Sequence, residues 1–147
     1  MIVYRITTEK WCRSLEASGN TARWNIKGSF IIYTAGSRAL ACLENIVHRS
    51  GEMSGKIYKV MMVEIPVSLE IQEIKKASMH KDWKSLTNYS YCQEKGNQWL
   101  TEGSTAILKV PSVIIEEEFN YLINPQHNQF KKIKLADVED FSFDARF

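Results

Sequence analysis

The sequence of 147 residues lacks an apolar run of the roughly 18 residues that a membrane-spanning helix needs, so we expect no membrane contact. Its N-terminus also lacks the basic segment and the long apolar segment of a signal peptide. The three cysteines, Cys12, Cys42 and Cys92, lie far apart and form no CxxC pair, which favours reduced thiols. Together these absences predict a cytoplasmic protein.

An excess of one charge is also missing. The formal net charge is only +2, and the lysines and arginines are scattered along the chain. Proteins that bind nucleic acid usually carry a clear basic excess or a basic stripe. We therefore expect no direct binding to nucleic acid.

The sequence signatures of several enzyme classes are absent. The chain contains no HExxH zinc motif, no P-loop, no GxGxxG and no GxSxG. His48, His80 and His127 are far apart in the sequence, so we predict no metal site. The sequence therefore does not support a zinc protease or an enzyme with one of the common nucleotide-binding loops.

What is present is typical of an ordinary globular domain. Hydrophobic residues make up 44% and charged residues 24% of a chain that shows no internal repeat and no linker. Strand-like segments outnumber helical ones, and the alternation of a doubly wound sheet is missing. We predict one domain over residues 1–147, of class α+β, with a mixed, mostly antiparallel sheet and a few helices.

The stretch from Ala22 to Glu44 is the centre of the prediction. Phe30 to Tyr33 is a short aromatic and β-branched run that favours a buried strand. Ser37 is a plausible N-cap for a helix that begins at Arg38, with apolar residues at helical spacing and a stop at Gly51. Glu44 falls at the edge of the apolar stripe of that helix. This order can bring the loop residue Arg23, Tyr33 and Glu44 to one cleft.

The remaining segments give a coarse plan of the chain. Pro66 near the end of one strand and Gly96-Asn97 inside one helix weaken the patterns there. We expect strands at Ile2–Thr7, Ile57–Val67, Leu69–Ile74 (paired with the preceding strand), Thr105–Val110, Val113–Ile115 and Phe130–Leu135, and an aromatic, apolar segment at Phe119–Asn124. We expect helices at Lys10–Ala17 and Ser90–Leu100, irregular chain or turns at Ser50–Gly55, Ala77–Thr87 and Glu116–Glu118, and an acidic, aromatic tail at Asp137–Phe147.

Several short motifs in a fixed order give the sequence a recognisable resemblance. They are Tyr4-Arg5-Ile6, Arg23-Trp24-Asn25 with Gly28, Tyr33, Leu43-Glu44, Val110-Pro111-Ser112, Asn120-Tyr121-Leu122, Asn124-Pro125 and the tail Phe141–Phe147. With these motifs the chain resembles the RES-domain family along nearly its whole length. One departure is Ala22, where family members often carry glycine before Arg-Trp-Asn.

The resemblance implies a fold similar to that of ADP-ribosyltransferases. It also implies a toxin of a bacterial toxin–antitoxin pair that consumes NAD as its substrate and requires no separate cofactor. Some relatives hydrolyse NAD, some phosphorolyse it, and some transfer ADP-ribose to a protein. The implied partner is a cognate helix-turn-helix antitoxin of the Xre type.

The resemblance also assigns roles to residues. Cleavage of the nicotinamide–ribose bond passes through a sugar cation, which the carboxylate of Glu44 would stabilise. The guanidinium of Arg23 would bind the pyrophosphate with two parallel hydrogen bonds. Tyr33 would stack on the nicotinamide ring. Ser112 would either contact the substrate or hold Glu44 in place.

Two further residues belong to the expected NAD site. Asn120 would support the site from behind the residues that touch the substrate. Arg5 would either bind phosphate in the cleft or pair with an acidic residue of the tail.

Each of these residues also has an ordinary interpretation. Without the resemblance, Arg23 would be a surface charge, Tyr33 a core residue and Ser112 a turn residue. Glu44 would be a surface carboxylate that faces His48 one helical turn away. Trp24 and Trp99 are expected in the core. A non-catalytic module that binds a nucleotide or a partner is the alternative to an enzyme.

Overall fold

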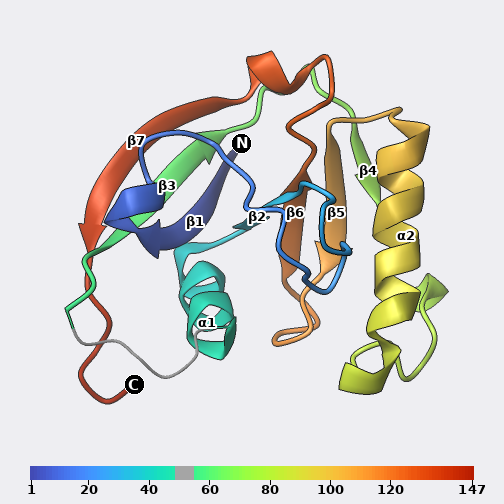
Figure 1. The fold of residues 1–147 in the computed structure, drawn as a ribbon, viewed down its shortest axis with the longest axis horizontal. Helices are drawn as coiled ribbons and strands as arrows, with labels where there is room; N and C mark the ends of the chain where they lie inside the picture. The colour runs from blue at the N-terminus through green and yellow to red at the C-terminus, as the bar shows by residue number, and fades with distance from the viewer. Residues whose placement is uncertain (49–54) are drawn as a thin grey trace.

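The computed structural model describes residues 1–48 and 55–147, which form one seven-stranded sheet and two α-helices (Figure 1). The strand order is β4-β5-β6-β2-β1-β3-β7, and every neighbouring pair is antiparallel except β4 and β5. The strands are β1 (Ile2–Thr8), β2 (Ile32–Ala35), β3 (Tyr58–Glu64), β4 (Ile71–Glu73), β5 (Ile107–Pro111), β6 (Phe119–Ile123) and β7 (Lys134–Phe141). The predicted α+β class with a mixed, mostly antiparallel sheet is confirmed.

Both α-helices pack on the same face of the sheet. In α1 (Arg38–His48), Leu40 and Ala41 form a cluster with Ile6 of β1, Ala35 of β2 and Val60 of β3. In α2 (Tyr89–Glu102), Trp99 lies in a second cluster with residues of β5 and β6, among them Leu108, Val110 and Leu122. Figure 1 shows the two helices on either side of β5 and β6.

The opposite face of the sheet has its own apolar cluster. It contains Val3 of β1, Ile32 of β2 and Val63 of β3, all fully buried. Leu15 and Ala17, from the chain between β1 and β2, pack against this cluster. The alternation of side chains along each strand thus feeds two separate apolar layers.

The start of α1 and the predicted helix at Ser90–Leu100 are confirmed. Ser37 Oγ accepts a hydrogen bond from the Leu40 N–H at 3.1 Å, which caps the first turn of α1. The helix stop predicted at Gly51 and most of the turn predicted at Ser50–Gly55 lie outside the described residues. Helix α2 ends at Gly103, which has a left-handed backbone with φ of 61°.

Gly96 sits inside α2 for a packing reason. A Cβ atom at this position would lie 1.8 Å from the Trp24 carbonyl oxygen. The helix therefore approaches the Trp24 backbone more closely than any side chain would allow. Trp24 and Trp99 are buried, as expected.

Four sequence-based predictions about strands and helices are wrong. Lys10–Ala17 is not an α-helix: a 3₁₀ turn covers Glu9–Trp11, and the chain beyond it is irregular. β4 does not pair with β3 but runs parallel to β5. No strand forms at Val113–Ile115, because this segment turns back around Ser112.

The fourth correction concerns the C-terminal region. The predicted strand at Phe130–Leu135 begins as a 3₁₀ turn, and the strand itself is β7. Asp137 to Phe141, which were expected in an acidic, aromatic tail, pair with β3. Smaller shifts occur elsewhere, since β2 begins at Ile32 and not at Phe30.

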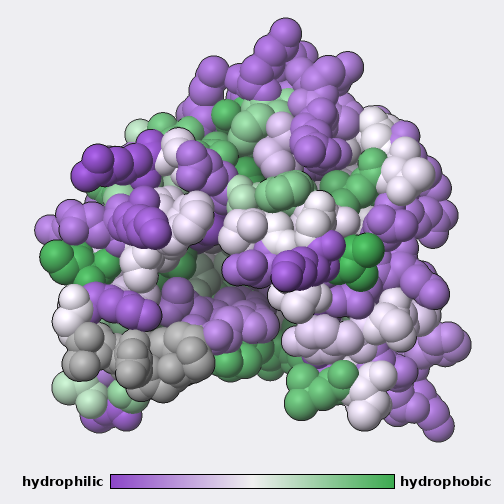
Figure 2. Space-filling view, viewed as in Figure 1, coloured by the Kyte–Doolittle hydropathy of each residue, from purple (hydrophilic) through white to green (hydrophobic). Residues whose placement is uncertain are grey.

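The surface of the described chain is largely polar. In the space-filling view hydrophilic residues dominate the visible face and hydrophobic residues form separate patches (Figure 2). Within residues 1–48 and 55–147, neither α-helix combines the length and apolar character that a membrane span requires.

Candidate active site

Glu44 lies where helix α1 meets the start of β6 and the end of β5. Its Oε1 accepts a hydrogen bond from Asn120 Nδ2 at 2.6 Å and another from Ser112 Oγ at 3.1 Å. Asn120 is on β6 and Ser112 directly follows β5. The structure therefore brings together three of the predicted site residues, and Ser112 has the geometry expected of a residue that holds Glu44.

The second oxygen of Glu44 contacts His48. Glu44 Oε2 lies 3.4 Å from His48 Nε2, one helical turn along α1. The Glu44 side chain is 22% exposed and the His48 side chain 59% exposed. The predicted contact with His48 is confirmed, so both oxygens of the partly exposed carboxylate have a partner in the protein.

The surroundings of Glu44 favour its ionised form. Partial burial would by itself raise the pKa of the Glu44 carboxyl, but hydrogen bonds from His48, Asn120 and Ser112 outweigh it and hold the pKa below its ordinary value. Glu44 is therefore a carboxylate at neutral pH, and its hydrogen bonds hold the carboxylate in one orientation.

Ser112 is completely buried and its hydroxyl is fully used. While Ser112 Oγ donates to Glu44, it accepts hydrogen bonds from the N–H groups of Ile114 at 3.0 Å and Ile115 at 3.2 Å. The same serine thus closes the turn after β5 and orients the carboxylate. Its ordinary interpretation as a turn residue is also correct.

Ion pairs hold the turn after β5 from its outer side. Glu116 pairs with Lys84 and, at 3.3 Å, with Lys76. These two lysines hold the pKa of the partly exposed Glu116 carboxyl below its usual value. The turn that carries Ser112 is therefore tied to the segment that precedes α2.

Tyr33 lies on the same face of the sheet as Asn120. Tyr33 opposes Leu122 on β6, and Asn120 opposes Ala35 on β2, so the two side chains are diagonal neighbours. The Tyr33 hydroxyl donates to Asn25 Oδ1 at 2.6 Å and accepts from the Trp24 N–H at 3.2 Å. Burial raises the pKa of this hydroxyl, so it stays protonated.

Asn25 organises the loop before β2, a role that the sequence analysis missed. Its side chain is buried, and Nδ2 donates to the carbonyl oxygens of Asn20, Ile26 and Ser29 at 2.9–3.0 Å. An asparagine in a glycine-containing loop is a known signal for such side-chain contacts with the backbone. Asn25 therefore fixes the loop that also carries Arg23.

Arg23 is buried against the segment that leads into α2. Its Nη1 donates to the Trp83 carbonyl at 3.1 Å and its Nη2 to the Lys84 carbonyl at 3.3 Å. The guanidinium carbon lies 4.5 Å from the centre of the Tyr89 ring. Because Arg23 is only 8% exposed, its interpretation as a surface charge is wrong.

Arg5 lies on the face of the sheet away from α1. Tyr4 and Ile6 pack toward α1, so the alternation of the strand points Arg5 the other way. Its Nη1 donates to the Glu16 carbonyl at 2.7 Å. The structure does not bring Arg5 to Glu44, and the acidic residue beside it is Glu16 of the irregular chain after β1, not one of the tail.

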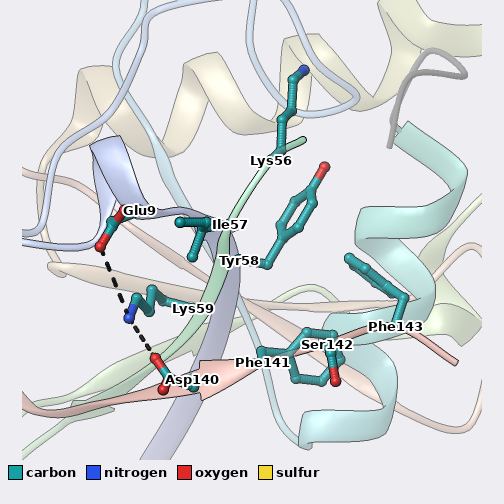
Figure 3. Close-up of a pocket in the computed structure, with 9 residues that line it drawn as sticks. All are labelled: Glu9, Lys56, Ile57, Tyr58, Lys59, Asp140, Phe141, Ser142 and Phe143. Carbon is teal, nitrogen blue, oxygen red and sulfur yellow. Dashed lines mark hydrogen bonds and ion pairs between the residues drawn. The ribbon is translucent and has the colours of Figure 1, made fainter. Parts of the chain in front are cut away.

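A surface hollow of about 440 Å³ lies elsewhere, between the start of β3 and the end of β7 (Figure 3). Glu44 is not among the residues that line it. Lys59 inside the hollow pairs with Asp140 and, at 4.0 Å, with Glu9, so its charge is already matched. The chemistry therefore favours the surroundings of Glu44 over this hollow.

Comparison with known proteins gives the family. The family model described as "RES domain" matches residues 2–144. A protein of Sphingobium sp. (strain YBL2) named "Prs ADP-ribosylating toxin" is 39% identical over 127 residues, which cover 84% of this chain and 78% of that protein. A protein of Yersinia enterocolitica named "Toxin Res" is 32% identical over 152 residues, 99% of both chains.

A third relative agrees with these two. A "Toxin Res" of Photorhabdus laumondii is 31% identical over 153 residues, which cover 99% of this chain and 96% of the relative. The match to the family model covers nearly the whole chain and includes Glu44, Ser112 and Asn120. This chain belongs to the RES-domain family of toxins.

Proposed function

We propose that this chain is a toxin that cleaves the nicotinamide–ribose bond of NAD and passes the ADP-ribose to water or phosphate. The observation that carries the proposal is the Glu44 carboxylate, which is ionised, held on Oε1 by Asn120 and Ser112, and partly exposed as a side chain. A carboxylate in a fixed position at the surface suits a reaction that develops positive charge on a sugar.

The chemistry follows from charge. As the bond to nicotinamide breaks, the electron pair leaves with the nicotinamide ring, which becomes neutral. The ribose becomes an oxocarbenium ion, and Glu44 interacts with that ion more strongly than with the intact substrate. Because the leaving group is neutral, the reaction needs no proton donor with a raised pKa.

The other site residues support this carboxylate. In our proposal Asn120 and Ser112 orient Glu44, and the ring of Tyr33 stacks on nicotinamide while its hydroxyl fixes the loop through Asn25. Arg23 holds the same loop against the segment before α2, since both of its Nη groups bind carbonyl oxygens. Direct contact between Arg23 and the pyrophosphate is the alternative role, and the KM for NAD of an Arg23→Lys variant distinguishes the two roles.

A second candidate function is transfer of ADP-ribose to a protein. The name of the Sphingobium relative, an ADP-ribosylating toxin, is the observation that favours it. The first chemical step is the same, and only the acceptor differs. A non-catalytic module that binds a nucleotide or a partner is the third alternative.

We further propose a cognate antitoxin of the helix-turn-helix Xre type that covers the surroundings of Glu44. A free enzyme that consumes NAD would deplete the cell that makes it. The toxin names of the relatives support this proposal. Expression of the chain alone should arrest growth, and co-expression with a neighbouring helix-turn-helix gene product should restore it.

The direct experiment measures nicotinamide released from NAD by the purified protein over time, with and without phosphate. Release by the purified protein without phosphate and without an acceptor protein indicates hydrolysis. Release that needs phosphate indicates phosphorolysis. Release that appears only with cell extract, with label from NAD on a protein, indicates transfer. NAD binding without any release would favour the non-catalytic module.

A further inference from the structure

Ala22 to Asn25 form a tight turn in the loop before β2. The Ala22 N–H donates to the Asn25 carbonyl at 3.0 Å, and the Asn25 N–H donates to the Ala22 carbonyl at the longer distance of 3.4 Å. Arg23 and Trp24 lie at the tip of the turn, and both are buried. Because a short hairpin is at best marginally stable by itself, the turn depends on contacts with the rest of the chain.

Gln93 of α2 contacts the base of this turn. Its Nε2 donates to the Ala22 carbonyl at 2.9 Å and to the Asn25 carbonyl at 3.2 Å, and it also reaches Thr21 Oγ1 at 3.2 Å. The amide has two N–H groups, and each carbonyl oxygen can accept a second hydrogen bond in addition to the one inside the turn. One side chain of the helix therefore binds both of the carbonyl oxygens that close the turn.

Other contacts hold the tip of the turn. Gly96, about one helical turn after Gln93, lies so close to the Trp24 carbonyl oxygen that no Cβ atom would fit. Arg23 donates to two carbonyl oxygens of the segment before α2. Since the tip and the base are held by different residues, a change at Gln93 loosens the base while the contacts of the tip remain.

The turn holds the end of the Tyr33 side chain. The Tyr33 hydroxyl accepts a hydrogen bond from the Trp24 N–H at 3.2 Å and donates one to Asn25 Oδ1 at 2.6 Å. Both of these groups belong to the turn whose base Gln93 binds. A shift of the turn therefore moves the anchor of the Tyr33 ring.

We propose that Gln93 is a positioning residue for NAD: by fixing the Ala22–Asn25 turn, it fixes the Tyr33 ring on which nicotinamide stacks. The inference rests on the proposed cleavage of NAD and adds a residue of α2 that sets the affinity for this substrate. Glu44 lies on α1 and accepts its hydrogen bonds from β6 and from the turn after β5. The loss of Gln93 therefore weakens substrate binding and leaves the chemical step intact.

The experiment measures the KM for NAD and kcat, from nicotinamide release, in the wild type and in Gln93→Met. Methionine has a similar length and helix propensity but no N–H donor. KM should rise about three- to tenfold, the effect of one lost hydrogen bond, and kcat should stay within about twofold of the wild type. Gln93→Glu places an acceptor against the same carbonyl oxygens and should raise KM at least as much. Gln98→Met, at an exposed position of the same helix, is the matched control and should keep the wild-type KM.

A double-mutant cycle tests whether Gln93 acts through Tyr33. Tyr33→Phe removes the hydroxyl by which the turn holds the ring, so it should raise KM by itself. If Gln93 acts through this hydroxyl, adding Gln93→Met to Tyr33→Phe should raise KM by less than about twofold more. Two effects that multiply in full would overturn the proposed connection.

The remaining outcomes separate this inference from the proposed function. An unchanged KM in both Gln93 variants, even with a lower melting temperature, would overturn the role of Gln93 while NAD cleavage stands. A fall in kcat at an unchanged KM would overturn it as well. If the wild type released no nicotinamide with water, phosphate or cell extract, the proposed function would fail, and this inference with it.

Discussion

Asn120 donates a hydrogen bond to Glu44 at 2.6 Å across a sequence separation of 76 residues. Asn120 opposes Ala35 of β2 on one side and Val110 of β5 on the other. Because β6 is fixed between two strands, the amide has little freedom to turn away. The Glu44 carboxylate is therefore positioned by the sheet as much as by its own helix.

The first prediction tests the charge of Glu44. Glu44→Gln keeps the shape of the side chain but removes its charge, so turnover of NAD should fall by roughly 10²–10³, the effect of one preorganised electrostatic group. NAD affinity and the melting temperature should change little, since the amide can still accept from Asn120 and Ser112. Full turnover by the folded variant would contradict the proposed mechanism.

The same variant gives a prediction for stability against pH. The folded-state pKa of Glu44 lies below its ordinary value of 4.5, so the ionised carboxylate stabilises the fold. That stabilisation is complete above the ordinary value and is lost as the pH falls through the lowered one. Urea unfolding at about pH 7 and pH 3 should therefore show a larger loss of unfolding free energy in the wild type than in Glu44→Gln.

The third prediction concerns Asn120. Asn120→Ala removes a hydrogen bond to a charged group, which typically contributes about 1.5–3 kcal/mol, so turnover should fall by about tenfold to a hundredfold. The pKa of Glu44 should rise, which moves the acid limb of the pH–rate profile to higher pH. Asn128→Ala, on the loop after β6, is the matched control. A lower rate with an unmoved acid limb would show that Asn120 acts on something other than Glu44.

The fourth prediction separates two roles of Arg23. Arg23→Lys keeps the charge, but one ammonium group cannot reproduce the two carbonyl contacts with Trp83 and Lys84. We expect unfolding free energy to fall by about 1–3 kcal/mol. The KM for NAD of the remaining folded enzyme should stay close to that of the wild type. A large rise in KM with unchanged stability would instead support direct contact with the pyrophosphate.

The fifth prediction concerns Gly96. Alanine has the higher helix propensity, by about 1 kcal/mol, yet its Cβ would lie 1.8 Å from the Trp24 carbonyl oxygen. Gly96→Ala should therefore destabilise the protein, by about 1–3 kcal/mol or more for a forced shift of packed backbone. Glu94→Ala, at an exposed position of the same helix, is the control and should change stability by less than about 0.5 kcal/mol.

Local patterns in the sequence predicted local features well. The cap at Ser37 and the contact between Glu44 and His48 depend on residues three or four positions apart, and both are present. The strands at β1 and β3 were also visible, because both segments are rich in apolar and β-branched residues. Such features need no knowledge of the rest of the fold.

Partners that are distant in sequence could not be predicted in this way. The apolar character of residues 69–74 indicates a strand but does not say that it pairs with β5 and not with β3. Gly96 counted against a helix because propensity does not include the approach of Trp24. The grouping of Ser112 and Asn120 around Glu44 was expected only from the family resemblance, since no spacing in the sequence indicates it.

The order in which the chain is synthesised gives the separation of Glu44 from its partners a further consequence. Glu44 is made early, Ser112 follows 68 residues later and Asn120 76 residues later. A growing chain that ends before residue 112 contains the carboxylate but neither of the groups that orient it, and it also lacks β6. The Glu44 carboxylate therefore obtains the partners that orient it only after residue 120 has been added to the growing chain.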